Sequence, residues 1–78
     1  MFEYAICTEP DEDVFYRQCK ALEKRFPEMK KLNMLDDVDG TLIQRYIHPE
    51  GKIKVKNDYL VGAVWVQSEF DLSPYFKK

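Results

Sequence analysis

Lysine and an aliphatic residue alternate without interruption from Lys52 to Lys56, directly after the turn-forming segment 48–51. In a β-strand, successive side chains point to opposite faces, so this alternation places all the lysines on one side and the aliphatic residues on the other. We therefore predict a β-hairpin formed by residues 41–48 and 52–56, with a further strand over residues 59–67. The chain is expected to fold around a sheet that has one apolar face and one basic face.

The residues of the turn predict the register of this hairpin. Pro49 suits the second position of a type I turn, and Gly51 suits the left-handed position of a three-residue loop. Such a loop pairs His48 with Lys52. The predicted apolar face then contains Ile43, Ile47, Ile53 and Val55, and the opposite face contains Leu42, Gln44, Tyr46, His48 and the three lysines 52, 54 and 56.

Two more segments complete the predicted fold. Residues 2–7 are mostly apolar, β-branched or aromatic, which favours a first strand. Apolar residues at helical spacing follow a run of acidic residues, and Pro27 ends this helix. Residues 27–40 have no decisive period and are predicted to be irregular. The predicted fold is α+β: a small single domain over residues 1–78, in the order β-α-β-β-β, with a mostly antiparallel sheet and one helix packed on one face.

Composition narrows the classes of function. A chain of 78 residues can build one small core and is too short for the large α/β enzyme scaffolds. Its net charge of −2 gives no overall attraction to nucleic acid or anionic lipid. Neither a membrane span nor a signal peptide is predicted. Cys7 and Cys19 fall at expected core positions, which favours free thiols in a reducing compartment, so a cytoplasmic location is expected.

The second face of the predicted sheet is the candidate interaction face. One helix covers only one face, so the other would expose aromatic and aliphatic side chains between lysines, a combination typical of contact surfaces. Three alternatives remain for what packs on this face: the segment 70–76 folding back, a second copy of the chain in a homodimer, or a foreign protein partner. The residues of this candidate face are Leu42, Tyr46, Lys52, Lys54, Lys56, Tyr59, Val61 and Trp65.

The same face supports a second interpretation, the binding of single-stranded nucleic acid. Sheets hold single strands by stacking bases on aromatic rings and by placing lysines near phosphates. The aromatic residues here are Tyr46, Tyr59 and Trp65, beside the three lysines. The net charge of −2 and the lack of a glycine-aromatic RNA-recognition string place this interpretation second.

Residues 37–42 read Asp-Val-Asp-Gly-Thr-Leu, which resembles motif I of the haloacid dehalogenase-like phosphatases. The resemblance implies a nucleophilic Asp37, a proton-transferring Asp39 and a Mg²⁺ ion between carboxylate and phosphate. It covers these positions alone, and the segment after Leu42 is too short for the other motifs of that family. An acidic turn that leads into a strand explains the same residues, so phosphatase chemistry ranks third.

The sequence contains no complete set of residues for a calcium site, a zinc site or a catalytic triad. Aligning Gly40 with the sixth position of an EF-hand loop puts Leu35 and Tyr46 where acidic residues are needed. The single histidine, His48, has no partners for a zinc site or a catalytic triad. We therefore predict no catalytic residue, metal ligand or cofactor. The expected function is non-enzymatic protein–protein contact, as in an adaptor, inhibitor or immunity protein.

Overall fold

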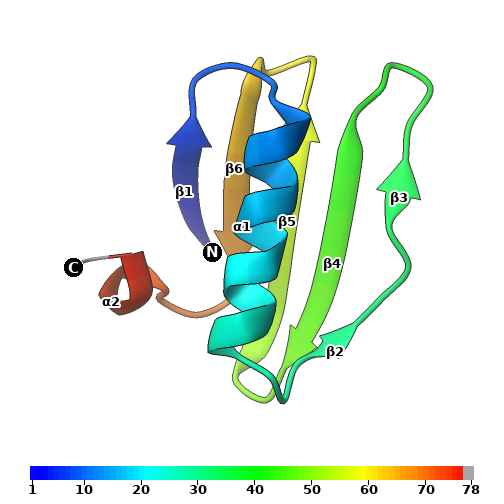
Figure 1. Ribbon diagram of the computed structural model, residues 1–78. Coiled ribbons are helices and arrows are strands. Elements are labelled where there is room, and N and C mark those ends of the chain that lie inside the picture. Colours follow the sequence, from blue (N-terminus) through cyan, green and yellow to red (C-terminus); the bar gives the residue numbers. More distant parts are fainter. Residues whose placement is uncertain (77–78) are drawn as a thin grey trace.

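The computed structural model describes residues 1–76, with the backbone alone at residue 76, and it contains one antiparallel sheet and one long helix. The strand order is β1-β6-β5-β4-β2, and β3 also pairs with β4 (Figure 1). The predicted α+β class, with one helix on one face of an antiparallel sheet, is confirmed. The elements are β1 (Phe2–Cys7), α1 (Glu12–Arg25), β2 (Lys30–Lys31), β3 (Leu35–Asp36), β4 (Leu42–His48), β5 (Gly51–Asp58), β6 (Ala63–Ser68) and α2 (Ser73–Phe76).

Local chemistry accounts for both ends of α1. The side chain of Asp11 accepts a hydrogen bond from the backbone N–H of Val14 at 3.2 Å and caps the N-terminus. Acidic residues occupy the first turn and basic residues the last, as the helix dipole favours. Pro27 disfavours a helical conformation at the residue before it, so the helix ends at Arg25. Three side chains of α1 are buried against the sheet: Phe15, Cys19 and Leu22.

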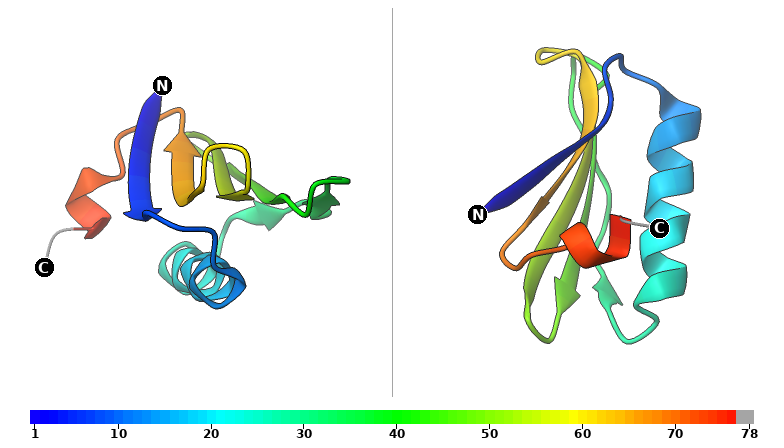
Figure 2. Two further views of the ribbon diagram at one scale, coloured as in Figure 1. Left: turned by 90° about the horizontal axis from the view of Figure 1, so that it is seen from above. Right: turned by 90° about the vertical axis from the view of Figure 1, so that its left-hand side faces the viewer.

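The core lies between α1 and the sheet, and the segment after β6 closes its lower end on the same side (Figure 2). Leu72 is fully buried, and the ring of Phe26 contacts the rings of Phe70 and Tyr75. The segment 70–76 therefore packs toward α1 and leaves the second face of the sheet uncovered, so the fold-back alternative is wrong. The side chain of Phe76, which was predicted to belong to this segment, lies outside the described residues. Within residues 1–76, no helix is both long and apolar enough to span a bilayer.

The β4–β5 hairpin differs from the prediction by one residue. His48 pairs with Gly51, so the loop consists of Pro49 and Glu50 alone. The backbone N–H of Glu50 donates to Nδ1 of His48 at 3.0 Å, which closes this shorter turn. A Cβ at Gly51 would lie 2.9 Å from Cβ of Glu69, so the close approach of these two chain segments requires glycine.

This shift reverses the predicted faces of β4, because a slip of one residue sends each side chain to the other side of the sheet. Tyr46 lies opposite Ile53 in the core, and its hydroxyl reaches Glu23 on α1. His48 is buried between the rings of Phe26 and Phe70. The predicted core positions Ile43 and Ile47 instead lie on the face away from α1.

Residues 27–40, predicted to be irregular, contain the short strands β2 and β3. Both lie at the outer edge of β4: Lys30 and Lys31 pair with its lower half, and Leu35 and Asp36 pair with its upper half. Two residues are too few to leave a pattern in the sequence, so only the presence of β4 as a template specifies these strands.

Candidate functional site

The sheet face turned away from α1, named the open face, has no element packed on it within residues 1–76 (Figure 2). Its members follow from the strand registers, since side chains directly opposite each other in neighbouring strands share a face. They are Glu3 and Ala5 on β1, Ala63, Trp65 and Gln67 on β6, Lys52, Lys54, Lys56 and Asp58 on β5, Ile43, Arg45 and Ile47 on β4, and Lys30 and Leu35 at the edge.

Four of the predicted site residues come together on this face, namely the three lysines and Trp65. Leu42 and Tyr46 do not, because the shifted hairpin places both in the core, where Leu42 is 6% and Tyr46 1% exposed. Their assignment to the candidate face is wrong for that reason. The face therefore keeps its basic row and loses one of its three predicted aromatic rings.

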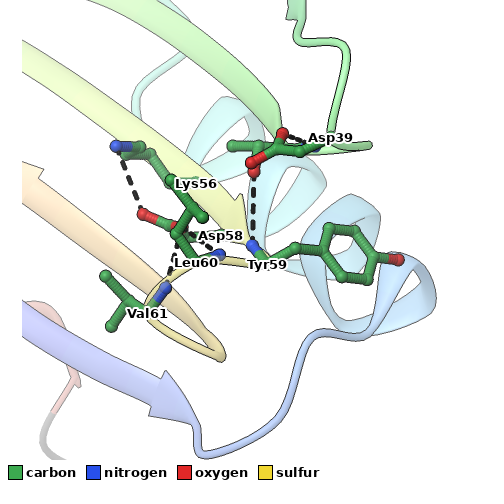
Figure 3. Close-up of polar contacts among 7 residues, drawn as sticks. Asp39, Lys56, Asp58, Tyr59, Leu60 and Val61 are labelled. Atoms are coloured by element: carbon green, nitrogen blue, oxygen red, sulfur yellow. Dashed lines mark hydrogen bonds and ion pairs between the residues drawn. The ribbon is translucent and has the colours of Figure 1, made fainter.

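Tyr59 and Val61 lie in the loop between β5 and β6, and they separate there. The ring of Tyr59 lies near Gly40 and points away from Lys56 and Asp58 (Figure 3). Val61 is 69% exposed and lines a hollow together with Trp65, so it adjoins the open face. Of the predicted aromatic residues, only Trp65 contributes its ring to the open face.

Arg45 is a functional candidate that was not predicted from the sequence. It lies directly opposite Lys54 across the β4–β5 pair, so two cations face each other. The signal that could have found it is the alternation along β4, where Arg45 shares a face with Ile43 and Ile47. The predicted register assigned that face to the core, in which an arginine has no expected role.

Charge compensation on the open face is uneven. Lys56 pairs with Asp58, at 3.4 Å between Nζ and Oδ2. Among the described residues, no carboxylate lies within ion-pairing distance of Arg45, Lys52 or Lys54. Nε of Arg45 is buried and has no hydrogen-bond partner in the part of the chain that the structure describes. Like charges directly opposite in a sheet are destabilising, so this arrangement lowers the stability of the free protein.

The three uncompensated cations converge on one hollow. Arg45, Lys52 and Lys54 line a depression of about 200 Å³, together with Glu69 and with apolar residues such as Leu32 and Ile47. Oε1 of Glu69 accepts a hydrogen bond from the backbone N–H of Lys52 at 2.7 Å, and this carboxylate forms no ion pair with the three cations. Guanidinium and ammonium groups of residues that line one space can donate several charge-assisted hydrogen bonds to a carboxylate or a phosphate oxygen. The hollow is thus a cationic site with an apolar border.

Lys56 and Trp65 form the second part of the open face. The ammonium of Lys56 lies 5.0 Å from the centroid of the Trp65 ring, within range of a cation–π contact. Its partner Asp58 accepts hydrogen bonds from the backbone N–H groups of Val61 and Leu60 at 3.1 and 2.9 Å (Figure 3). The hydrogen bond from Val61 is the main cause that holds the pKa of Asp58 below its usual range, and Lys56 acts in the same direction. This carboxylate stays charged and orients Lys56 over the ring.

The phosphatase-like segment forms the tight turn between β3 and β4. Oδ1 of Asp37 accepts from the backbone N–H of Val38 at 2.7 Å, and Oδ1 of Asp39 accepts from that of Thr41 at 3.0 Å. Gly40 takes the positive φ of 89° that the turn needs. Both carboxylates act here as turn-forming groups. In the part of the chain that the structure describes, no three side chains of the metal-ligating types form a cluster able to hold an ion.

Comparison with protein families, curated proteins and solved structures finds no match to this chain.

Proposed function

We propose that this chain is a non-enzymatic binding protein that contacts an acidic partner protein through its open face. The observation that carries this proposal is the opposition of Arg45 and Lys54, with Lys52 beside them, in one hollow. Glu69 also lines this hollow, but none of the three cations forms an ion pair among the described residues. A sequence that places like charges together at a cost in stability is typical of a site that meets an opposite charge in its complex.

Charge also argues against self-association through this face. A two-fold dimer buries the same patch of both copies, and this patch holds more basic residues than acidic ones, so the dimer would bring an excess of like charge together. Juxtaposed like charges at an interface are unfavourable, whereas a negatively charged partner gains from each of them. The proposed role is that of an adaptor or inhibitor, and the free thiols Cys7 and Cys19 favour a reducing compartment such as the cytoplasm.

Trp65 is the single tryptophan of the chain and lies on the open face, so its fluorescence reports binding there directly. The test is a titration with poly-L-glutamate at low and at moderate salt. We expect a saturable fluorescence change that weakens as salt rises, and we expect Lys54→Gln to reduce the affinity several-fold. The control is Lys24→Gln, which removes the same charge from the last turn of α1. Absence of binding at low salt, or equal losses in both variants, would contradict the proposal.

The second candidate is the binding of single-stranded nucleic acid, and the contact between Lys56 and Trp65 favours it. A ring beside a cation can stack a base while the cation approaches a phosphate. With Tyr46 in the core and Tyr59 turned away, a single ring remains for stacking, so this function stays second. An oligothymidine titration under the same conditions separates the two. Tighter binding of oligothymidine than of polyglutamate would make nucleic acid the primary partner.

A further inference from the structure

An apolar trough lies on the open face beside the lysine row. It has a volume of about 460 Å³, and its lining includes Ala5, Val61, Ala63 and Trp65. Ala5 and Val61 are exposed, so this apolar surface is not used by the core of the chain. It is separate from the cationic hollow, which lies around Arg45.

The strand register explains why the trough exists. Ala5 on β1 lies directly opposite Trp65 on β6, and Ala63 precedes Trp65 by two residues on the same face. Two side chains that end at Cβ next to an indole ring and an exposed valine leave space that larger residues would fill. Apolar hollows next to a tryptophan are typical of the places where interfaces receive an anchor side chain.

Charge decides which kind of partner suits this trough. Lys56 lies opposite Trp65 on β5, one strand away from the trough, and Lys54 is the next lysine along the row. Neighbouring strands are about 4.8 Å apart, and consecutive Cα atoms of a peptide are about 3.8 Å apart. One residue of a bound segment can therefore fill the trough while its neighbour reaches a lysine. Glu3 also lines the trough, so carboxylates of the partner are favoured on the β5 side.

We propose that the trough receives a large apolar side chain, such as phenylalanine, from an acidic segment of the partner protein, whose carboxylates contact the uncompensated Lys54. This inference rests on the proposed function and adds the feature that distinguishes one acidic partner from another. The lysines attract many acidic surfaces, whereas the trough selects those that carry an apolar anchor between their acidic residues.

The test compares two synthetic peptides of equal charge. Both are short runs of glutamate and aspartate; one has phenylalanine at its centre and the other has serine. Titrations followed by Trp65 fluorescence at low salt are expected to show about tenfold tighter binding of the phenylalanine peptide, as burial of an aromatic side chain predicts. Ala5→Leu, which fills the trough from an exposed position of β1, is expected to abolish this preference, so that the two peptides bind with equal affinity.

The possible outcomes separate this inference from the proposed function. Equal, salt-dependent binding of both peptides would contradict the proposed anchor side chain and would agree with the proposed acidic partner. A lack of binding by either peptide would overturn the proposed function itself. If Ala5→Leu lowers the affinity for both peptides, Ala63→Leu provides a second filling of the same trough. Retention of the preference in both leucine variants would show that phenylalanine binds elsewhere and would overturn the anchor. Tighter binding of oligothymidine than of the phenylalanine peptide would also contradict the proposed anchor side chain.

Discussion

The hydroxyl of Tyr46 donates a hydrogen bond to Oε2 of Glu23 at 2.6 Å and thereby joins the middle of β4 to α1. Lys31 approaches the same carboxylate oxygen at 3.2 Å from β2. One acidic side chain thus links the helix, a central part of the sheet and its short edge strand. This link also fixes which face of β4 turns inward.

Tyr46→Phe is expected to lower the free energy of unfolding by about 1–2 kcal/mol, because the ring stays buried while the hydrogen bond to a partly exposed carboxylate is lost. Urea denaturation followed by circular dichroism measures this change. Tyr16→Phe is the control, since Tyr16 lies on α1 and is 44% exposed, and its effect should be close to zero. Equal effects of the two substitutions would show that the link between Tyr46 and Glu23 contributes nothing to stability.

The pKa of Glu23 gives a second readout of this variant. Burial raises that pKa, but the hydrogen bonds from Tyr46 and Lys31 lower it by more, so it lies below the usual range for glutamate. Removal of the Tyr46 hydroxyl should therefore raise the pKa of Glu23, as an NMR titration of its side-chain carboxyl would report.

Alkaline pH should destabilise the protein through Tyr46. Burial, together with the hydrogen bond to Glu23, raises the pKa of Tyr46 far above its usual value, so the folded chain keeps a proton that the unfolded chain releases near pH ~10. The stabilising contribution of Tyr46 is complete below that pH and is lost as the pH rises further, by up to about 1.4 kcal/mol per pH unit.

Lysines also titrate in this range, so the measurement is a comparison. Urea denaturation between pH 9 and 11 is expected to show a steeper loss of stability for the wild-type chain than for Tyr46→Phe. Parallel curves for the two proteins would contradict the assignment to Tyr46.

The two cysteines should differ in reactivity. Cys19 is 5% exposed, and burial is the main cause that raises the pKa of its thiol, so little thiolate forms at neutral pH. Cys7 is partly exposed at the end of β1, where the pairing with β6 is irregular. Ellman's reagent is expected to modify one thiol quickly and the other only as the chain unfolds. Cys7→Ser should remove the fast phase, and a fast phase that persists in this variant would contradict the burial of Cys19.

The sequence predicted β5 well and β4 poorly, for a physical reason. In β5 the apolar and basic sets are strictly separated, so only one orientation buries Ile53 and Val55. In β4 both sets contain aliphatic residues, and the alternation does not decide between them. The orientation depends on contacts distant in sequence, such as those of Tyr46 with Glu23 and of His48 with Phe70.

The same limit applies to the candidate site. The lysines and Trp65 were predicted to share a face from the alternation along two neighbouring strands, and the structure places them on one face. The predicted start of the last strand at Tyr59 is wrong, because residues 59–62 form the loop between β5 and β6. Arg45 was missed, since its face followed from the wrong hairpin register. Local sequence patterns also could not predict which side of the sheet the segment 70–76 packs on. It is set in part by a hydrogen bond from the backbone N–H of Leu72 to the hydroxyl of Tyr4, at the other end of the chain.

Lys54→Glu should make the protein more stable and remove its proposed activity. The substitution replaces the like-charge pair of Arg45 and Lys54 with an opposite-charge pair, which is expected to raise the free energy of unfolding by about 0.5–1 kcal/mol at low salt. The gain should shrink as salt screens the charges. The same change places a carboxylate in the cationic hollow and should abolish the binding of polyglutamate.

The matched control for this variant is Lys24→Glu, the same charge reversal in the last turn of α1. A negative charge there opposes the helix dipole, so this control is expected to lower stability slightly and to leave binding largely unchanged. If Lys54→Glu alone raises stability and abolishes binding, the repulsion between Lys54 and Arg45 is a feature kept for binding. If the repulsion had no role in binding, its removal would raise stability and leave the affinity unchanged. A destabilised Lys54→Glu that still binds polyglutamate would contradict this explanation.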